Sequence, residues 1–255
     1  MHHQLQTETI IGIVAAAVLS NYNMATERLI LFDIDGTLTR SQNGYIPFNE
    51  ALLKTFGIDG DIRTVVPDGN TDPRIVEDIF TKANIEMEIS QAQWTQFAAN
   101  LRHSYRHSVQ RGTTTVRALP GTLDLLKTLS AHGSFYQGIV TGNFEVTARI
   151  KLETAGLDSY LGVGAFAGDS SHRPDLPGIA KARWEQSLGK SIAPEQCIIV
   201  GDTPNDFEAA RHNRMKCILV GTGRYPLEEL MYWQPDACLP DLSDTALALN
   251  TIMNL

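Results

Sequence analysis

The sequence LILFDIDGTLT, at residues 29–39, places two aspartates one residue apart directly after an unbroken apolar run. Four consecutive apolar residues are typical of a strand that is buried on both faces in a parallel sheet. Open parallel sheets bind ligands at the carboxyl ends of their strands, which is where Asp33 and Asp35 fall. Residues two apart in extended geometry point to the same side, so the two carboxylates are expected to lie close together.

Two neighbouring carboxylates repel each other, and burial raises the free-energy cost of ionising them. A divalent cation that prefers oxygen ligands relieves this repulsion, and Mg2+ is the usual ion where phosphate is also bound. Gly36 allows the sharp turn that must follow the strand. The pattern by itself also fits an Asp-Gly turn with exposed carboxylates.

Composition narrows the classes of partner. At 255 residues, the chain is long enough for one large domain with an insertion or for two domains. Its formal net charge of -8 argues against nucleic acid or an anionic membrane as the main partner, because both attract clustered lysine and arginine. The three cysteines are widely spaced with no CxxC pair, so neither a disulfide framework nor a zinc site is predicted. We therefore expect a cytoplasmic protein without stable membrane association.

The N-terminal segment differs in character from the rest of the chain. The stretch TIIGIVAAAVLS, at residues 8–19, is apolar but too short to span a bilayer, and no lysine or arginine precedes it as in a signal peptide. Met24 opens the sequence that leads into the first strand. Residues 1–24 are interpreted as an N-terminal extension, either an over-long start or a loosely attached helix. A targeting or anchoring segment is the alternative.

From residue 116 onward, short apolar stretches alternate with amphipathic helical ones, which is the order of a doubly wound α/β sheet. Strands are expected at 135–140, about 163–166, 197–200 and 216–220, and helices at about 121–132, 144–155, 176–188 and 242–253. Between the first strand and residue 116, the periodic stretches 49–56, 72–83 and 91–109 predict only helices. We expect an α/β core of residues 25–41 and 116–255, interrupted by a helical cap at residues 42–115.

Two more strand ends carry polar groups. Thr141, Gly142 and Asn143 follow an apolar strand and precede a helix, where a hydroxyl and free backbone N–H groups can hold a phosphate. Asp202 follows a later strand, and Asp206 lies about one helical turn further on. Ordinary helix capping is the alternative at both places, since Thr, Asn and Asp are common caps.

Taken together, these motifs resemble those of the haloacid dehalogenase (HAD) superfamily of phosphohydrolases, in particular its phosphoglycolate-phosphatase-like branch with a helical cap. DIDGT comes first, Thr-Gly follows a second strand, and GDTPND follows a later one. The right order at three separate strand ends makes the combination specific, and the resemblance extends from about residue 28 to the end. It implies a doubly wound, Rossmann-like parallel sheet core with an inserted all-helical cap domain.

The resemblance also implies a mechanism through an aspartyl phosphate. Asp33 would be the nucleophile that attacks a phosphomonoester, and Asp35 would protonate the departing alcohol and then activate water. Thr141 would bind the phosphoryl oxygens together with Gly142 and Asn143.

A Mg2+ cofactor is part of the same resemblance. The ion would be held by the Asp33 carboxylate, the Asp35 backbone carbonyl and Asp202. Asp206 would hold a water bound to the metal, from outside that ligand set.

One position departs from the usual pattern of the family. The family normally uses a lysine, often followed by proline, to balance the charge of the nucleophile and the phosphate, whereas this chain has Arg173 before Pro174. Arginine presents a fixed, always charged fork and lysine a compact point charge, so the exchange is not neutral. We expect Arg173 in this role rather than Lys181, which is expected on the solvent face of the following helix.

The cap is expected to close over the site and to supply selectivity. Four of its arginines are candidates to contact a second anionic group of the substrate, with solvated helix faces as the alternative for each: Arg74, Arg102, Arg106 and Arg111.

The sequence therefore predicts a Mg2+-dependent phosphatase, monomeric or homodimeric, that acts on a small phosphorylated metabolite such as a phosphoglycolate-like compound or a sugar phosphate. A sugar phosphomutase of the same superfamily shares the nucleophile and stays an alternative. The alternative from another class is a non-catalytic phosphate-binding regulatory protein, although the presence of both Asp33 and Asp35 argues against it.

Overall fold

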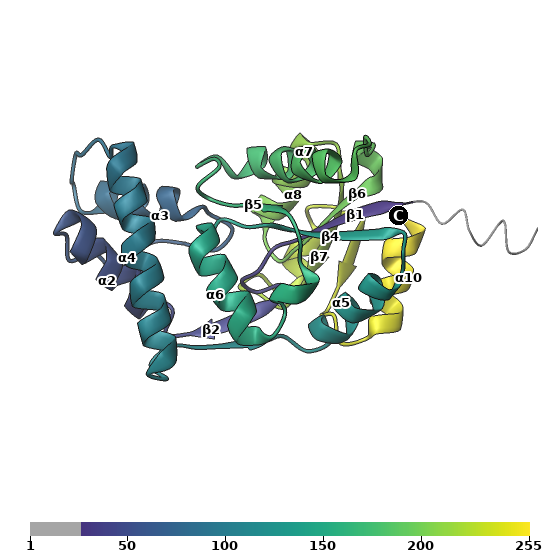
Figure 1. Ribbon diagram of the computed structural model, residues 1–255, viewed down its shortest axis with the longest axis horizontal. Coiled ribbons are helices and arrows are strands. Elements are labelled where there is room, and N and C mark those ends of the chain that lie inside the picture. Colours follow the sequence, from purple (N-terminus) through teal and green to yellow (C-terminus); the bar gives the residue numbers. More distant parts are fainter. Residues whose placement is uncertain (1–26) are drawn as a thin grey trace, which may run out of the picture.

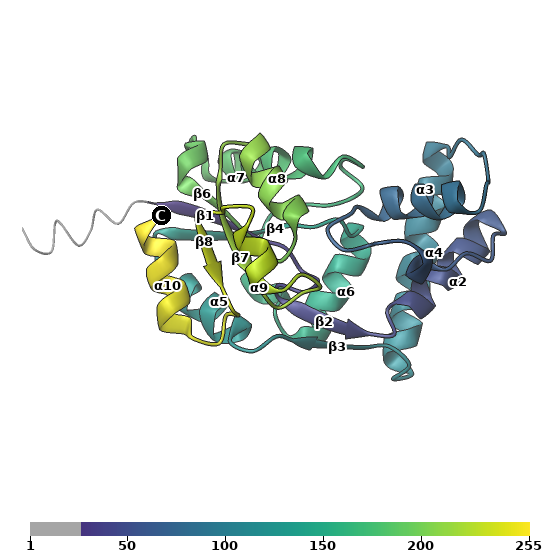
Figure 2. The same ribbon diagram turned by 180° about the vertical axis from the view of Figure 1, so that it is seen from behind.

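The computed structural model describes residues 27–255, which form a six-stranded sheet with helices on both faces (Figures 1 and 2). The expectations for residues 1–24 lie outside the described residues. Within residues 27–255, no helix is both long and apolar enough to cross a bilayer.

All six strands of this sheet run parallel, in the spatial order β5-β4-β1-β6-β7-β8. The strands are β1 (Arg28–Phe32), β4 (Phe135–Val140), β5 (Gly164–Ala165), β6 (Cys197–Gly201), β7 (Lys216–Val220) and β8 (Ala237–Leu239). The chain first adds β4 and β5 on one side of β1 and then returns to add β6 on the other side. This is the doubly wound topology that the sequence predicts, and its change of direction beside β1 is where such sheets bind ligands.

Alternate residues of β1 pack on opposite faces of the sheet because side chains alternate along a strand. Ile30 and Phe32 pack in the layer that contains α5 (Thr122–Ala131), α6 (Glu145–Ala155) and α10 (Thr245–Asn254). Leu29 and Leu31 pack on the other face with α7 (Leu176–Leu188), α8 (Pro204–His212) and α9 (Leu227–Met231). All four side chains are fully buried, as predicted for a strand covered on both faces.

The strands and helices predicted for the core are confirmed, with small differences at their ends. The last helix begins at Thr245 because the Asp244 side chain caps it, accepting a hydrogen bond from the Leu247 N–H (2.9 Å). The sequence patterns do not predict α8, α9 or β8, since these short elements carry little periodicity. Short 3-10 turns are η1 (Ile62–Thr64), η2 (Asp158–Tyr160), η3 (Arg173–Asp175) and η4 (Pro194–Gln196).

Three helices lie together beyond the carboxyl edge of the sheet, namely α2 (Tyr45–Phe56), α3 (Asp72–Lys82) and α4 (Gln91–Gln110) (Figure 1). Their apolar faces form a core of their own, in which the ring centroids of Phe48 and Phe97 are 5.5 Å apart. Phe144, which precedes α6, packs into the same cluster. The apolar packing of the cap therefore continues onto the α/β core.

An antiparallel strand pair, β2 (Thr39–Gln42) and β3 (Thr115–Ala118), leads the chain out of the sheet region and back (Figure 2). Residues 42 and 115, the expected ends of the cap, are the last residue of β2 and the first of β3. The pair thus spans both expected boundaries, and the division of the chain into core and cap stays a proposal.

We expect Leu126→Ala to lower the free energy of unfolding by about 2 to 5 kcal/mol, because Leu126 is fully buried and its truncation leaves a cavity. Leu53→Ala is the matched control, since Leu53 also lies in a helix but is 49% exposed. Leu53→Ala is expected to lower the free energy of unfolding by less than about 1 kcal/mol. Urea unfolding followed by circular dichroism measures both losses, and equal losses would contradict this description of the core.

Candidate active site

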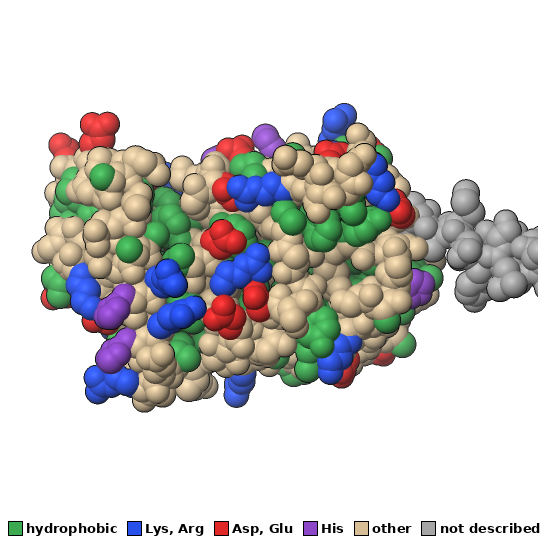
Figure 3. All heavy atoms as spheres, viewed as in Figure 1, with side chains coloured by type: hydrophobic (Ala, Val, Ile, Leu, Met, Phe, Trp, Pro, Cys, Tyr) green, Lys and Arg blue, Asp and Glu red, His purple; other side chains and the backbone are tan. Residues whose placement is uncertain are grey.

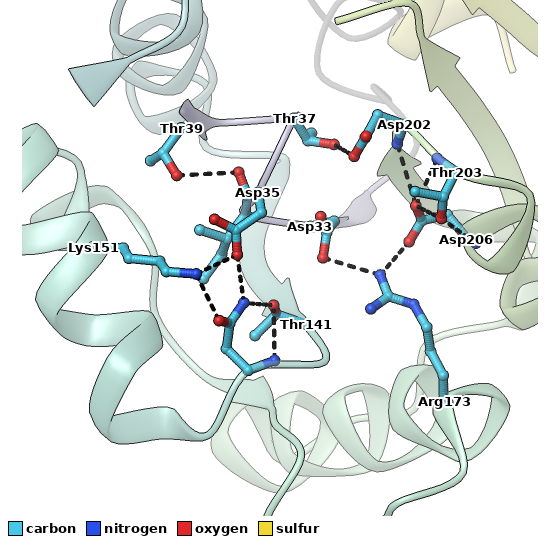
Figure 4. A network of polar contacts seen from close by, with 12 residues as sticks. Asp33, Asp35, Thr37, Thr39, Thr141, Lys151, Arg173, Asp202, Thr203 and Asp206 are labelled. Carbon is cyan, nitrogen blue, oxygen red and sulfur yellow. Dashed lines mark hydrogen bonds and ion pairs between the residues drawn. The ribbon is translucent and has the colours of Figure 1, made fainter. Parts of the chain in front are cut away.

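The candidate site is built where β1, β4 and β6 end side by side (Figure 4). Asp33 follows β1, Thr141 follows β4 and Asp202 follows β6. Because β1 lies between the other two strands in a parallel sheet, these residues meet at one edge. The Asp33 N–H donates to the Val200 carbonyl (2.9 Å), which holds the end of β1 against β6.

Asp33, Asp202 and Asp206 form a buried acidic cluster at this edge. Carboxylate oxygens of the three lie within 4.8 Å of one another. The residues are only 6%, 2% and 1% exposed. Burial raises the pKa of Asp33 to about 7, and burial also raises the pKa of Asp202 well above its usual value. The neighbouring carboxylates add to both increases, so the cluster is short of positive charge.

The Arg173 guanidinium supplies part of that charge. Its Nη2 donates to Asp33 Oδ1 (3.0 Å) and to Asp206 Oδ1, and its side chain is buried. Its Nε is buried and has no hydrogen-bond partner within residues 27–255. Lys181, the other candidate, pairs with Glu185 on α7 (2.7 Å). The structure thus brings Arg173, and not Lys181, to Asp33.

The start of α8 holds Asp206 in place. Its Oδ2 accepts hydrogen bonds from the Thr203 hydroxyl (2.7 Å) and from the backbone N–H groups of Thr203 (3.0 Å) and Asp202 (3.2 Å). Thr203 is the N-cap of α8, with its side chain accepting from the Asp206 N–H (3.3 Å). Capping of this helix by Asp202, the alternative considered from the sequence, is therefore wrong.

The turn after Asp35 requires glycine for two reasons. Gly36 has a φ of +85°, a conformation that residues with side chains rarely adopt. A Cβ at this position would also lie 2.4 Å from Asp202 Oδ2. The next residue, Thr37, donates to Asp202 Oδ1 (3.0 Å), so the turn itself orients a member of the acidic cluster.

Asp35 has partners of its own, toward α6 (Figure 4). Its Oδ2 accepts hydrogen bonds from Lys151 Nζ (2.5 Å) and from Asn143 Nδ2 (2.7 Å). Its side chain is 41% exposed, far more than that of Asp33. The two aspartates thus lie in different environments although one residue separates them.

Lys151, on α6, is a residue of this site that the sequence patterns do not reveal. Its side chain is 9% exposed, its Nζ donates to Asn143 Oδ1 (2.7 Å), and the Nζ lies 5.6 Å from the centroid of the Tyr105 ring. Burial lowers the pKa of Lys151, but the charge and hydrogen bond of Asp35, together with Tyr105 and Asp72, outweigh burial, and the pKa is raised. Helical spacing is the sequence signal that could have revealed this lysine, because Thr147 and Lys151 share the buried face of the helix that follows Asn143.

The loop of residues 141–143 is closed by its own side chains. Thr141 is fully buried, and its hydroxyl accepts hydrogen bonds from Asn143 Nδ2 (2.8 Å) and from the Asn143 N–H (3.3 Å). The N-cap of α6 is Phe144, which makes no side-chain capping bond. Helix capping by Thr141 or Asn143 is therefore also wrong.

The start of α3 is fastened to this loop. The Asp72 N–H donates to the Gly142 carbonyl (2.7 Å), and Asp72 Oδ2 accepts from the Phe144 N–H (2.7 Å). A Cβ on Gly142 would lie 2.0 Å from the Asn70 carbonyl oxygen. Glycine is therefore required for the cap to approach the loop this closely.

A cavity of about 310 Å³ lies between the cap and the core, and both Asp33 and Asp35 line it. On the core side it is also lined by Thr141, Asn143, Lys151 and Arg173. On the cap side it is lined by Tyr45, Arg63, Asn70 and Tyr105, among others. Such a volume is at the small end of the range for ligand sites.

The four cap arginines proposed from the sequence do not line this cavity: Arg74, Arg102, Arg106 and Arg111. Arg74 pairs with Asp78 on α3 (3.2 Å) and is 60% exposed. Figure 3 shows basic and histidine side chains gathered on the outer face of the cap, where Arg102 and Arg106 line a groove on α4. Arg63 lines the cavity instead, with its guanidinium 3.9 Å from the centroid of the Tyr45 ring.

The acidic cluster has the chemistry of a divalent cation site. Three carboxylates facing one guanidinium leave an excess of negative charge, and all the available ligand atoms are oxygens, as Mg2+ prefers. A cation at this place would relieve the repulsion that contributes to the raised pKa values of Asp33 and Asp202.

Comparison with known proteins places these features in context. The chain matches the model of the haloacid dehalogenase-like hydrolases over residues 30–220. It is 25% identical over 224 residues to the pyrophosphatase PpaX of Listeria monocytogenes, covering 84% of this chain and 93% of that protein. It is 28% identical over 214 residues to a phosphoglycolate phosphatase of Rhodospirillum rubrum, covering 80% of this chain and 84% of that protein. The solved structure of a hydrolase from Pseudomonas syringae superposes with a TM-score of 0.63 and 23% identity, covering 88% and 98% of the two chains.

Asp72→Asn is expected to weaken the pH dependence of stability. Burial raises the pKa of Asp72 to about 7, so between about pH 4 and pH 7 the folded protein keeps a proton that the unfolded chain releases. The contribution of Asp72 to stability therefore falls as the pH rises through this range. Asparagine can still accept the hydrogen bond from the Phe144 N–H.

Urea unfolding at pH 5 and pH 8 tests this expectation. The stability of the variant relative to the wild type should increase by about 1 to 3 kcal/mol between the two pH values. The control is Asp59→Asn, at an exposed position, for which the difference from the wild type should stay constant. A constant difference for Asp72→Asn as well would show that this carboxyl does not titrate in the expected range.

Proposed function

Because the chain belongs to the haloacid dehalogenase-like hydrolases, we propose that it is a Mg2+-dependent phosphatase that hydrolyses a small phosphorylated metabolite through an aspartyl phosphate. The observation that carries the proposal is the contact between buried Asp33 and Arg173 at the wall of the cavity. The Nε of Arg173, which has no hydrogen-bond partner within the described part of the chain, leaves donor capacity for an anionic group rich in acceptor oxygens. The relatives named as phosphatase and pyrophosphatase support a phosphorylated substrate.

In the first half-reaction, the Asp33 carboxylate attacks phosphorus, and the bond between phosphorus and the ester oxygen breaks as the new oxygen–phosphorus bond forms. Asp35 donates a proton to the leaving oxygen, which departs as an alcohol. Arg173 and Thr141 donate hydrogen bonds to the phosphoryl oxygens, where negative charge spreads in the transition state.

In the second half-reaction, Asp35 is a carboxylate and takes a proton from water as the water oxygen attacks phosphorus. The bond between phosphorus and Asp33 breaks, which releases inorganic phosphate and restores the free carboxylate. The contact of the cap with the 141–143 loop limits the access of bulk water to this intermediate.

Mg2+ would be held by the carboxylates of Asp33 and Asp202 and by the Asp35 backbone carbonyl, with Asp206 holding a metal-bound water. When bound, the ion supplies positive charge next to the phosphoryl group. Thr37 and Thr203 keep the carboxylates of this cluster oriented through the hydrogen bonds described above.

The cavity favours a small substrate, such as a phosphoglycolate-like compound or a sugar phosphate. Arg63 lies on the cap side of the cavity and is 59% exposed at its side chain. Its Nε and Nη2 donate to the Asp61 carboxylate, which leaves Nη1 to contact a second anionic or polar group of the substrate. We propose Arg63 for this contact in place of Arg74, because Arg63 lines the cavity and Arg74 does not.

Asp33→Asn is expected to abolish Mg2+-dependent phosphate release while leaving the fold intact, because the amide keeps the shape of the side chain but is not a nucleophile. Phosphate release and isomerised product are measured for a panel of phosphoglycolate, sugar phosphates and pyrophosphate, with and without EDTA. Circular dichroism checks the fold. Near-normal turnover by the variant would rule out the mechanism, and isomerised product without phosphate would indicate a phosphomutase.

Arg173→Ala is expected to lower kcat/KM by roughly 30- to 1000-fold at saturating Mg2+, since a lost charge-assisted contact of this kind costs about 2 to 4 kcal/mol in the transition state. Arg173→Lys should recover much of the loss because it keeps the charge. Lys181→Ala is the control and should change kcat/KM by less than about 2-fold. A large loss in the control with a silent Arg173→Ala would reverse the assignment.

A further inference from the structure

The mechanism above does not use Lys151, although this lysine is almost fully enclosed next to Asp35. An enclosed ammonium destabilises a protein unless hydrogen bonds and opposite charge compensate it. Here both are present, because its Nζ donates to Asp35 Oδ2 (2.5 Å) and to Asn143 Oδ1 (2.7 Å). The lysine lies on the buried face of helix α6 and not on a loop.

We propose that Lys151 is a positioning residue for Asp35, whose carboxylate it holds at the cavity wall for both proton transfers. The inference rests on the proposed function, since it concerns the residue that transfers the protons there. No direct contact between Lys151 and the reacting atoms is required.

A closed ring of hydrogen bonds supports this role. Asn143 accepts from Lys151 through Oδ1 and donates through Nδ2 to the same Asp35 oxygen (2.7 Å), so each of the three side chains contacts the other two. The Asn143 Nδ2 also donates to Thr141 Oγ1 (2.8 Å), which ties the ring to the 141–143 loop. Within residues 27–255, Asp35 Oδ1 has no hydrogen-bond partner, so this oxygen is available to a substrate or a water.

The cap completes the surroundings of the ammonium. The Tyr105 ring, from α4, has its centroid 5.6 Å from Lys151 Nζ, and the Tyr105 hydroxyl donates to Ser41 Oγ (3.2 Å). Asp72, at the start of α3, is near enough to interact electrostatically with this lysine when its carboxyl is ionised. The lysine that holds Asp35 is therefore itself enclosed by a side chain of the cap.

A double-mutant cycle with p-nitrophenyl phosphate and Mg2+ tests the proposal. Lys151→Met is expected to lower kcat by about 10- to 100-fold, with KM changing by less than about 3-fold. In an Asp35→Asn background, the same substitution should lower kcat by less than about 3-fold, because the lysine acts only through the carboxylate. Lys151→Arg, which keeps the charge and the donors, should recover part of the loss.

Two measurements separate positioning from a general effect on the fold. Lys181→Met removes another helical lysine that pairs with a carboxylate, and it should leave kcat unchanged. Thermal unfolding reports whether Lys151→Met folds, and Lys151→Gln, which keeps a donor but not the charge, replaces it if it does not.

The outcomes distinguish this inference from the proposed function. Equal losses in the two backgrounds, or no loss in the wild-type background, would overturn the positioning role while Mg2+-dependent turnover by the wild type still supports the phosphatase. A wild type that turns over neither p-nitrophenyl phosphate nor the metabolite panel would overturn the proposed function, and the inference with it.

Discussion

This site depends on how the negative charge of its buried carboxylates is balanced, because few positively charged groups lie close to them. The parallel pairing of β1 with β6 forces Asp33 and Asp202 together, and the first turn of α8 adds Asp206. Each buried charge costs several kcal/mol unless it is paired and hydrogen-bonded. Arg173 and the start of α8 supply such partners, yet the raised pKa of Asp33, about 7, shows that the compensation is incomplete. A divalent cation would supply the missing positive charge, and the carboxylate oxygens are the ligands that such an ion prefers.

Two different basic side chains, Arg173 and Lys151, give Asp33 and Asp35 different environments although the aspartates are one residue apart. Asp33 is enclosed and contacts Arg173, whereas Asp35 is 41% exposed at its side chain and contacts Lys151. Different environments for paired carboxylates are the physical basis of distinct roles as nucleophile and as acid–base residue. Gly36 makes the separation possible, because the turn it allows directs the chain away from β1 immediately after Asp35.

The junction between the cap and the core is built on the same loop that supports the site. Asp72 binds on both sides of Asn143, through the Gly142 carbonyl and the Phe144 N–H. A displacement of α3 therefore acts on the loop that positions Asn143 and, through it, Asp35. The contacts that join the cap to the core thus also hold the loop that supports the site.

Local patterns in the sequence determined the strands and most helices, since the apolar run of β1 and the alternation after residue 116 leave few topologies. They also determined that Asp33, Thr141 and Asp202 meet, because parallel strands end at a common edge. Only the tertiary structure decided that Lys151 faces Asp35, 116 residues away, and that Arg63 rather than Arg74 faces the cavity. A helix or turn carries the same local pattern whether its charged side chain points to solvent or to a distant partner, and that choice depends on how the elements pack.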